Sequence, residues 1–264
     1  CGPPFTMNSK DTILLIHGFG NNFRVWDQYI DFFRHNGFDV VAPNLRFHGP
    51  EDSIVGLESI SLLDYIDDLV EVITSMKVKP IIIGYSMGGL LTLKLMERGF
   101  GKMGICLAPA APRGINAISI SVIRLFFKNL LVWKFWKKAH APEFSSAYFG
   151  ALGHLPRDEA WKIFDRVSSY ESGRVGAEIG FPVFDPCRAS EVDEKKIKCP
   201  VLVVGSYKDK VTPVRIARNV AKKLLPVSDY KEYATFGHWL MTGKEFSIVS
   251  EHCLLWIQDK LAKN

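Results

Sequence analysis

The chain has 264 residues, of which 47% are hydrophobic, and its 33 Lys and Arg exceed its 28 Asp and Glu to give a net charge of +5. Such a length and composition are typical of an ordinary soluble globular protein with one sizeable core and room for an insertion. The positive charge is too small and too dispersed for a nucleic-acid groove, so we expect no nucleic-acid partner.

We do not expect the first six residues of the chain to be part of the fold. Residues 1–6 (CGPPFT) precede Met7 and contain neither a charged nor an apolar region, so we interpret them as a cloning remnant and Met7 as the native start. An acylated Cys1 is the alternative, but no signal sequence supports it. Five cysteines, forming neither a C-x-x-C pair nor an even set, favour a reduced, cytoplasmic protein. Cys106 and Cys253 lie in apolar segments, where we expect core positions.

Short apolar segments alternate with helix and loop signals along the chain. A helix is predicted over 61–76, where Ser61 and Asp64 have capping-box spacing before an apolar stripe. Strands are predicted within residues 12–18, 38–49, 81–83, 103–110, 201–206 and 230–235. This alternation predicts an α/β fold, with a mostly parallel central sheet flanked by helices.

One long segment breaks the alternation. Residues 112–191 contain no convincing buried strand, and we predict that they form a helical cap or lid inserted into a core made of 7–111 and 192–264. Within this segment, the aromatic and basic stretch 118–138 is interrupted by cations and makes a poor transmembrane span.

Taken as one helix, 118–138 places four cations on one side, namely Arg124, Lys128, Lys134 and Lys138. Apolar residues that include Phe126, Leu130 and Trp133 occupy the rest of its surface. We favour a cap helix packed on the core, whose cations reach out to solvent. The alternative is an interfacial lid that touches lipid, so contact with a membrane surface is possible but not favoured.

The sequence GYSMGG, residues 84–89, follows the isoleucines of a buried strand and opens an apolar helix. Gly84 and Gly88 flank Ser86 with G-x-S-x-G spacing, in which glycines allow a turn sharp enough to present the hydroxyl at a helix N-terminus. Such a serine can act as a nucleophile if a base and an acid lie elsewhere. On its own, the pattern can also be an ordinary helix start.

A base and an acid follow in the order that this turn requires. Asp209 comes three residues after the predicted strand 201–206, and His238 follows the next strand, so both loops leave the same edge of a parallel sheet. A single loop aspartate is more often a helix cap, but the three residues together predict a Ser-His-Asp triad. Asp193 and Glu194 are weaker candidates for the acid because they precede the strand.

The attacked carbonyl also needs donors for its developing negative charge. The loop His17-Gly18-Phe19-Gly20 follows the first strand, and we predict the N–H groups of Phe19 and Met87 as the oxyanion pair. For His17 we prefer a structural role, in which its ring braces the loop by hydrogen bonds.

At these residues the chain resembles the α/β-hydrolase fold superfamily, of the serine esterase and lipase type. The resemblance rests on HGFG at 17–20, GYSMGG at 84–89, LRFHG at 45–49, GSYKD at 205–209 and FGH at 236–238. It implies the same triad, Ser86, Asp209 and His238, and the same donors, Phe19 and Met87. Related sequences commonly have an Asp and a Gly where this chain has Asn44 and Phe47.

We therefore expect a serine hydrolase that cleaves carboxylic esters with an apolar acyl or alcohol group through an acyl-enzyme, for example an esterase, monoacylglycerol lipase or lysophospholipase. Substrate contacts are expected from Phe126, Leu130, Trp133 and Trp239, and neither a metal nor an organic cofactor is expected. The alternatives are a hydrolase-fold protein that binds a small ligand with little turnover and a hydrolase or lyase that breaks a carbon–carbon bond.

Overall fold

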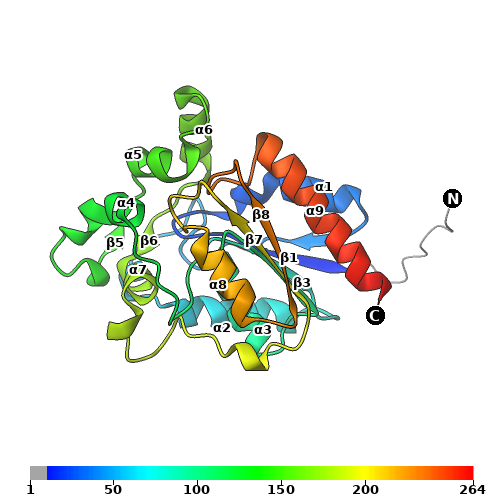
Figure 1. Cartoon of the computed structure of the whole chain (residues 1–264). Helices are drawn as coiled ribbons and strands as arrows, with labels where there is room; N and C mark the ends of the chain where they lie inside the picture. The colour runs from blue at the N-terminus through cyan, green and yellow to red at the C-terminus, as the bar shows by residue number, and fades with distance from the viewer. Residues whose placement is uncertain (1–10, 264) are drawn as a thin grey trace.

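The computed structural model describes residues 11–263. The predicted cloning remnant at 1–6 and the start at Met7 lie outside the described residues. Figure 1 shows a central sheet with helices on both faces, and a second group of elements, α4 to α7 with β5 and β6, gathered to one side of it.

Six parallel strands form the central sheet within residues 11–263, in the order β2-β1-β3-β4-β7-β8. They are β1 (Thr12–Ile16), β2 (Asp39–Val41), β3 (Ile81–Tyr85), β4 (Met103–Leu107), β7 (Val201–Ser206) and β8 (Ser228–Tyr233). The predicted strands are all present, and the prediction of a mostly parallel sheet is confirmed. Since all six run the same way, the loops that follow them leave from one edge.

The middle strands are buried on both faces, which explains their nearly continuous apolar sequences. In β1, Leu14 and Ile16 join one hydrophobic cluster while Ile13 and Leu15 join the other. The sheet thus separates two cores, and each needs its own layer of helices.

Separate layers of helices cover the two faces of the sheet (Figure 1). The first layer contains α1 (Asp27–His35) and α9 (Gly243–Ala262), and the second contains α2 (Leu62–Thr74), α3 (Met87–Glu97) and α8 (Arg215–Lys223). Short 3₁₀ turns, η1 (Phe23–Trp26), η2 (Leu57–Ser59) and η6 (Glu194–Lys196), join these elements.

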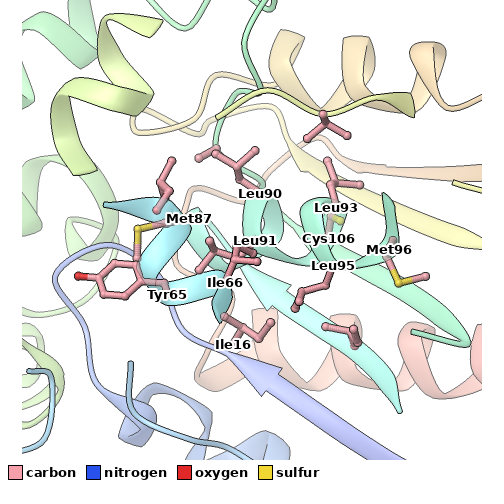
Figure 2. Close-up of a cluster of buried hydrophobic side chains, with 14 of the residues drawn as sticks. Ile16, Tyr65, Ile66, Met87, Leu90, Leu91, Leu93, Leu95, Met96 and Cys106 are labelled. Atoms are coloured by element: carbon pink, nitrogen blue, oxygen red, sulfur yellow. The ribbon is translucent and has the colours of Figure 1, made fainter. Parts of the chain in front are cut away.

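Helix α2 begins as the sequence predicts. The Ser61 side chain accepts the Leu63 N–H, and the Asp64 carboxylate accepts the Ser61 N–H, which completes the capping box. Figure 2 shows Tyr65 and Ile66 of this helix in one apolar cluster with Leu90 and Leu91 of α3. The predicted core positions of Cys106 and Cys253 are also confirmed, because both side chains are fully buried.

The segment predicted as a cap is mostly helical, with two short strands. Its elements are α4 (Ile120–Leu130), η3 (Phe135–Lys137), β5 (Ala139–His140), α5 (Phe144–Ala147), η4 (Tyr148–Leu152), α6 (Arg157–Val167), β6 (Glu171–Ser172), α7 (Gly173–Gly180) and η5 (Pro182–Phe184). Strands β5 and β6 pair antiparallel, and these two-residue pieces escaped the sequence prediction.

The expectation of one helix across 118–138 is wrong. Helix α4 ends at Leu130, and Lys134 adopts a left-handed backbone with φ 53° before the short turn η3. Lys134 and Lys138 therefore do not continue the face of Arg124 and Lys128, since left-handed backbone cannot be part of a right-handed helix. None of the helices within residues 11–263 combines the length and the hydropathy that a membrane span requires.

Helix α3 lies unusually close to the strands beneath it. A Cβ atom added at Gly88 would stand 2.1 Å from the Ile16 carbonyl oxygen of β1, and one at Gly84 would stand 2.0 Å from the Gly88 carbonyl oxygen. These distances leave no room for any side chain, and they involve backbone that cannot move alone. The two glycines are therefore required to pack α3 against the sheet.

We predict that Gly88→Ala lowers the free energy of unfolding by about 1–3 kcal/mol or more, because the new methyl group must push α3 away from β1. Gly180→Ala is the matched control, since nothing lies within 4 Å of the Cβ that it would add. Urea denaturation of both variants measures the difference. Equal stability of the two variants would contradict this account of the packing.

Candidate active site

Ser86 occupies the turn between β3 and α3 with φ 55° and ψ −117°. This backbone conformation is strained for a residue with a side chain and costs about 1–3 kcal/mol, so the surroundings must enforce it. Three backbone hydrogen bonds do so: the Ser86 N–H donates to the Leu107 carbonyl, and the Ser86 carbonyl accepts the N–H groups of Gly89 and Ala110, each at 2.9 Å. The serine is therefore held at the N-terminus of an eleven-residue helix.

The structure brings Asp209 and His238 together, as the sequence order predicts. His238 Nδ1 lies 2.7 Å from Asp209 Oδ2, and both side chains are almost completely buried. Asp209 comes from the loop after β7 and His238 from the loop after β8, so adjacent parallel strands deliver the pair to the same edge. Ser86 and His238 line one cavity, although neither the Ser86 hydroxyl nor His238 Nε2 hydrogen-bonds to another described residue.

Hydrogen bonds fix the Asp209 carboxylate on all sides. Its Oδ1 accepts the N–H groups of Val211 and Thr212, at 2.8 and 2.7 Å, and its Oδ2 accepts the Thr212 hydroxyl at 2.9 Å. That hydroxyl also lies 2.9 Å from the Ala108 carbonyl oxygen, beyond the end of β4. Thr212 was missed as a site residue, because its sequence signal, a Thr before Pro213, is that of a helix start.

The weaker acid candidates lie elsewhere. Asp193 caps the turn η6 by accepting the Lys195 N–H, and Glu194 pairs with Lys223 at 3.0 Å. Neither makes a contact with His238 that would orient the imidazole.

The HGFG loop packs directly against the serine. A Cβ at Gly18 would stand 3.1 Å from Ser86 Cβ, which only a glycine allows without displacement. The N–H groups of Phe19 and Met87 donate no hydrogen bond to another residue within 11–263. His17 has the expected structural role, because its Nε2 accepts the Leu45 N–H at 3.1 Å and ties this loop to the one after β2.

Phe47 is one of the two positions at which this chain departs from related sequences. Its backbone has φ 66°, the left-handed region that glycine enters most easily. The position where relatives commonly carry Gly thus keeps a glycine-like conformation with a phenylalanine. Asn44 is the other such position, and its Oδ1 accepts the Phe23 N–H at 2.9 Å.

Two cavities meet at Ser86. The apolar cavity, of about 400 Å³, runs beneath α4 and is lined by residues that include Met87, Val122, Ile123, Ile179 and Ile216. The smaller cavity, of about 190 Å³, has a mainly apolar wall that includes Phe164, Val167 and Trp239, with polar groups from Asn21, Ser168, Glu171 and His238. Ser86, Phe19, Phe126, Asn129, His140 and Val211 line both cavities.

The predicted substrate contacts fall into two groups. Phe126 lines both cavities, Leu130 lines the apolar cavity and Trp239 lines the smaller cavity. The structure does not place Trp133 with them: its side chain is 79% exposed, because α4 ends three residues earlier and the chain turns outward. Phe127 also faces outward, 53% exposed.

Other features of the molecule lie apart from this site. A hollow of about 970 Å³ lies between the segments 58–59, 135–137 and 174–187 and contains none of the predicted site residues. Within residues 11–263, the His, Cys, Asp and Glu side chains form no group of three or more suited to a metal ion.

Known proteins resemble this chain in sequence and in fold. A mouse protein called Protein ABHD8 is 30% identical over 216 residues, which is 81% of this chain and 48% of that protein. The chain thus spans about half the length of this curated relative.

Solved structures of the same fold include a Paleococcus ferrophilus monoacylglycerol lipase, with a TM-score of 0.69, 19% identity and 93% of each chain covered. A polyneuridine aldehyde esterase has a TM-score of 0.68 and 14% identity, with 95% of this chain and all of the other covered. At these identities the likeness concerns the α/β-hydrolase fold alone.

The family model described as serine aminopeptidase, S33, matches residues 7–245, which is most of the sequence and includes every element of the site described above. The chain therefore belongs to this family of α/β hydrolases.

Proposed function

We propose that this chain is a serine hydrolase of carboxylic esters with an apolar acyl or alcohol group, and that Ser86, His238 and Asp209 form its catalytic triad. The observation that carries the proposal is the buried His238–Asp209 pair, 2.7 Å between Nδ1 and Oδ2, in the wall of the cavity that also contains Ser86. A strained serine at a helix N-terminus beside an oriented imidazole is the arrangement that nucleophilic catalysis requires.

In the first step, His238 Nε2 takes the proton of Ser86 as its oxygen attacks the ester carbonyl. Asp209 accepts the Nδ1–H, so it fixes the tautomer that leaves Nε2 unprotonated, and it stabilises the imidazolium that forms. When the ester binds, a short shift of the Ser86 side chain or of the His238 ring completes the contact, since catalytic hydrogen bonds often tighten only in the substrate complex.

The negative charge that develops on the carbonyl oxygen meets the N–H groups of Phe19 and Met87. Both lie next to Ser86 and make no bond to another described residue, so they can bind an oxyanion without first breaking a contact. The N-terminus of α3 adds a favourable dipole. The imidazolium then protonates the leaving alcohol, and water repeats the cycle on the acyl-enzyme.

The two cavities support the choice of an ester that has an apolar group. The apolar cavity can take a hydrocarbon acyl chain, and the smaller cavity, which adds the polar groups around His238 to a mainly apolar wall, can take the leaving alcohol. Esters are also the substrates named for solved structures of this fold, a monoacylglycerol lipase and an aldehyde esterase.

Replacing Ser86 by Ala should reduce hydrolysis of p-nitrophenyl esters by several orders of magnitude, roughly 10⁶-fold by analogy with other serine hydrolases, because no nucleophile remains. A fluorophosphonate probe should label the wild type at Ser86 and leave the variant unlabelled. Labelling that persists in the variant would show a different nucleophile, and a labelled wild type with no turnover of any ester would favour a ligand-binding protein.

Asp209→Asn should reduce kcat by about 10⁴-fold with little change in KM, since the amide cannot stabilise the imidazolium and favours the wrong tautomer. Asp193→Asn is the matched control, because Asp193 only caps a surface turn. Steady-state kinetics on a short ester measures both. A larger loss of kcat in the Asp193 variant would show that Asp209 is not the acid of the triad.

The role of the segment 118–138 can be tested with one aromatic residue that lines the cavities and one that is exposed. Phe126→Ala should shift the preferred acyl length in a p-nitrophenyl ester series, because Phe126 lines both cavities and its ring meets Phe19 edge-on, 6.0 Å between centroids. Trp133→Ala should leave the series unchanged, because its side chain is 79% exposed.

The lipid-touching alternative predicts the reverse pattern. Trp133→Ala would then weaken binding to anionic vesicles, and it would lower activity only once the substrate forms an emulsion. Such a result, with no change in the preferred acyl length for Phe126→Ala on soluble esters, would contradict a cap packed on the core and favour an interfacial lid.

A further inference from the structure

A buried carboxylate from the cap segment lies behind the HGFG loop. Glu171, in β6, is 1% exposed, and four donors converge on it. Its Oε2 accepts the Gly20 N–H at 3.0 Å and lies 3.2 Å from His48 Nε2, while its Oε1 accepts the Tyr65 hydroxyl at 2.7 Å and the Ser172 N–H at 2.8 Å. The loop after β1, the loop after β2, α2 and β6 thus meet at one side chain.

The ring of His48 carries a positive charge in this arrangement. Its Nδ1 lies 2.8 Å from the Arg46 carbonyl oxygen and its Nε2 faces the Glu171 carboxylate, and both oxygens only accept. Both ring nitrogens must therefore donate, which requires the imidazolium. Burial opposes the charges, but the pair overcomes it, raising the pKa of His48 and lowering the pKa of Glu171.

The neighbouring His17 stays neutral, which keeps the charge at His48. Burial, together with the His48 cation 5.2 Å away between ring centroids, lowers the pKa of His17 to about 3. Its Nε2 can therefore accept the Leu45 N–H without competing for the carboxylate.

The segment before Glu171 holds Gly20 from the other side. The Ser169 N–H donates to the Gly20 carbonyl and the Asn22 N–H donates to the Val167 carbonyl, both at 2.9 Å. The Gly20 N–H donates to Glu171, whereas the preceding N–H, that of Phe19, bonds to no described residue. Of two successive N–H groups in this loop, one is thus held by the cap segment and the other has no partner among residues 11–263.

We propose that Glu171 is a positioning residue, whose charged carboxylate anchors the Gly20 N–H and thereby directs the Phe19 N–H toward Ser86. The inference rests on the proposed function, because it assigns Glu171 to the oxyanion-binding loop of that reaction. Glu171 lines the smaller cavity, but its side chain is 2% exposed and four donors fill its oxygens, so it is suited to hold the loop and not to bind substrate.

Four converging donors explain why a carboxylate is needed. An amide of the same shape has one accepting oxygen, so Glu171→Gln must turn its NH₂ group either toward the Gly20 N–H or toward the Ser172 N–H. In the first orientation the loop loses its anchor. In the second, β6 is pushed away and the Gly20 N–H faces an uncharged oxygen, so the anchor is weaker in both orientations.

The test compares Glu171→Gln with Glu178→Gln. Glu178 is a second buried cap carboxylate, 3% exposed, which accepts the Leu62 N–H at 2.8 Å and pairs with Arg174, away from the HGFG loop. Both variants lose a buried charge, so thermal denaturation of each measures the general cost to the fold. Only the Glu171 variant should change the loop.

Hydrogen exchange supplies the readout that does not depend on activity. Amides of peptides spanning 17–22 should exchange faster in Glu171→Gln than in the wild type or Glu178→Gln. Unchanged exchange would overturn the proposal whether or not the protein hydrolyses esters, while loss of ester turnover in the wild type would overturn only the proposed function.

Kinetics supplies the second readout. In Glu171→Gln, kcat should fall about 10- to 100-fold with KM little changed, somewhat less than the loss of an oxyanion donor in other hydrolases. Binding of an alkyl trifluoromethyl ketone, whose serine adduct places an oxyanion at the same donors, should weaken by a similar factor, and Glu171→Asp should recover part of both. Equal kcat losses in the Glu171 and Glu178 variants, or a rise in KM alone, would instead show a general loosening of the cap.

Discussion

The close approach of α3 to β1 and β3 is the constraint on which the rest of the site depends. Gly84 and Gly88 leave no space for a Cβ between helix and sheet, and so the chain must reverse within one residue, Ser86. The resulting φ of 55° is unfavourable by itself. It persists because the bonds from Ser86 to Leu107, Gly89 and Ala110 would all break if the turn relaxed.

The parallel sheet then determines which other side chains can reach the serine. In the strand order β3-β4-β7-β8, strand β4 lies between β3 and the strands β7 and β8, whose following loops contain Asp209 and His238. The Thr212 hydroxyl bridges that gap, because it contacts both Asp209 and the Ala108 carbonyl just beyond β4. The acid loop is thus fastened to the end of the strand next to the serine.

Sequence reasoning succeeded where the signal was local. The strands, the capping box of α2 and the arrangement that delivers Asp209 to His238 all follow from short-range periodicity and from the order of segments in a parallel sheet. It failed for α4, because an apolar run such as 118–138 has no breaker to mark the turn after Leu130. It also missed Glu171, whose partners His48 and Tyr65 are 123 and 106 positions away in the sequence. A single Glu in a polar stretch carries no sign of such partners.

The different roles that we propose for His17, His48 and His238 follow from the hydrogen bonds that each ring donates and accepts. His17 accepts at Nε2 and lies near a cation, so it stays neutral, whereas His48 donates from both nitrogens, which requires the imidazolium. A general base needs one nitrogen fixed and the other free to gain and lose a proton. Among the three, only His238 satisfies this, with Nδ1 held by Asp209 and Nε2 without a hydrogen bond to a described residue. Two buried His–carboxylate pairs thus lie near the same serine. In the His48–Glu171 pair, the second ring nitrogen donates to the Arg46 carbonyl and the pair holds the loop. In the His238–Asp209 pair, the second nitrogen remains available for proton transfer.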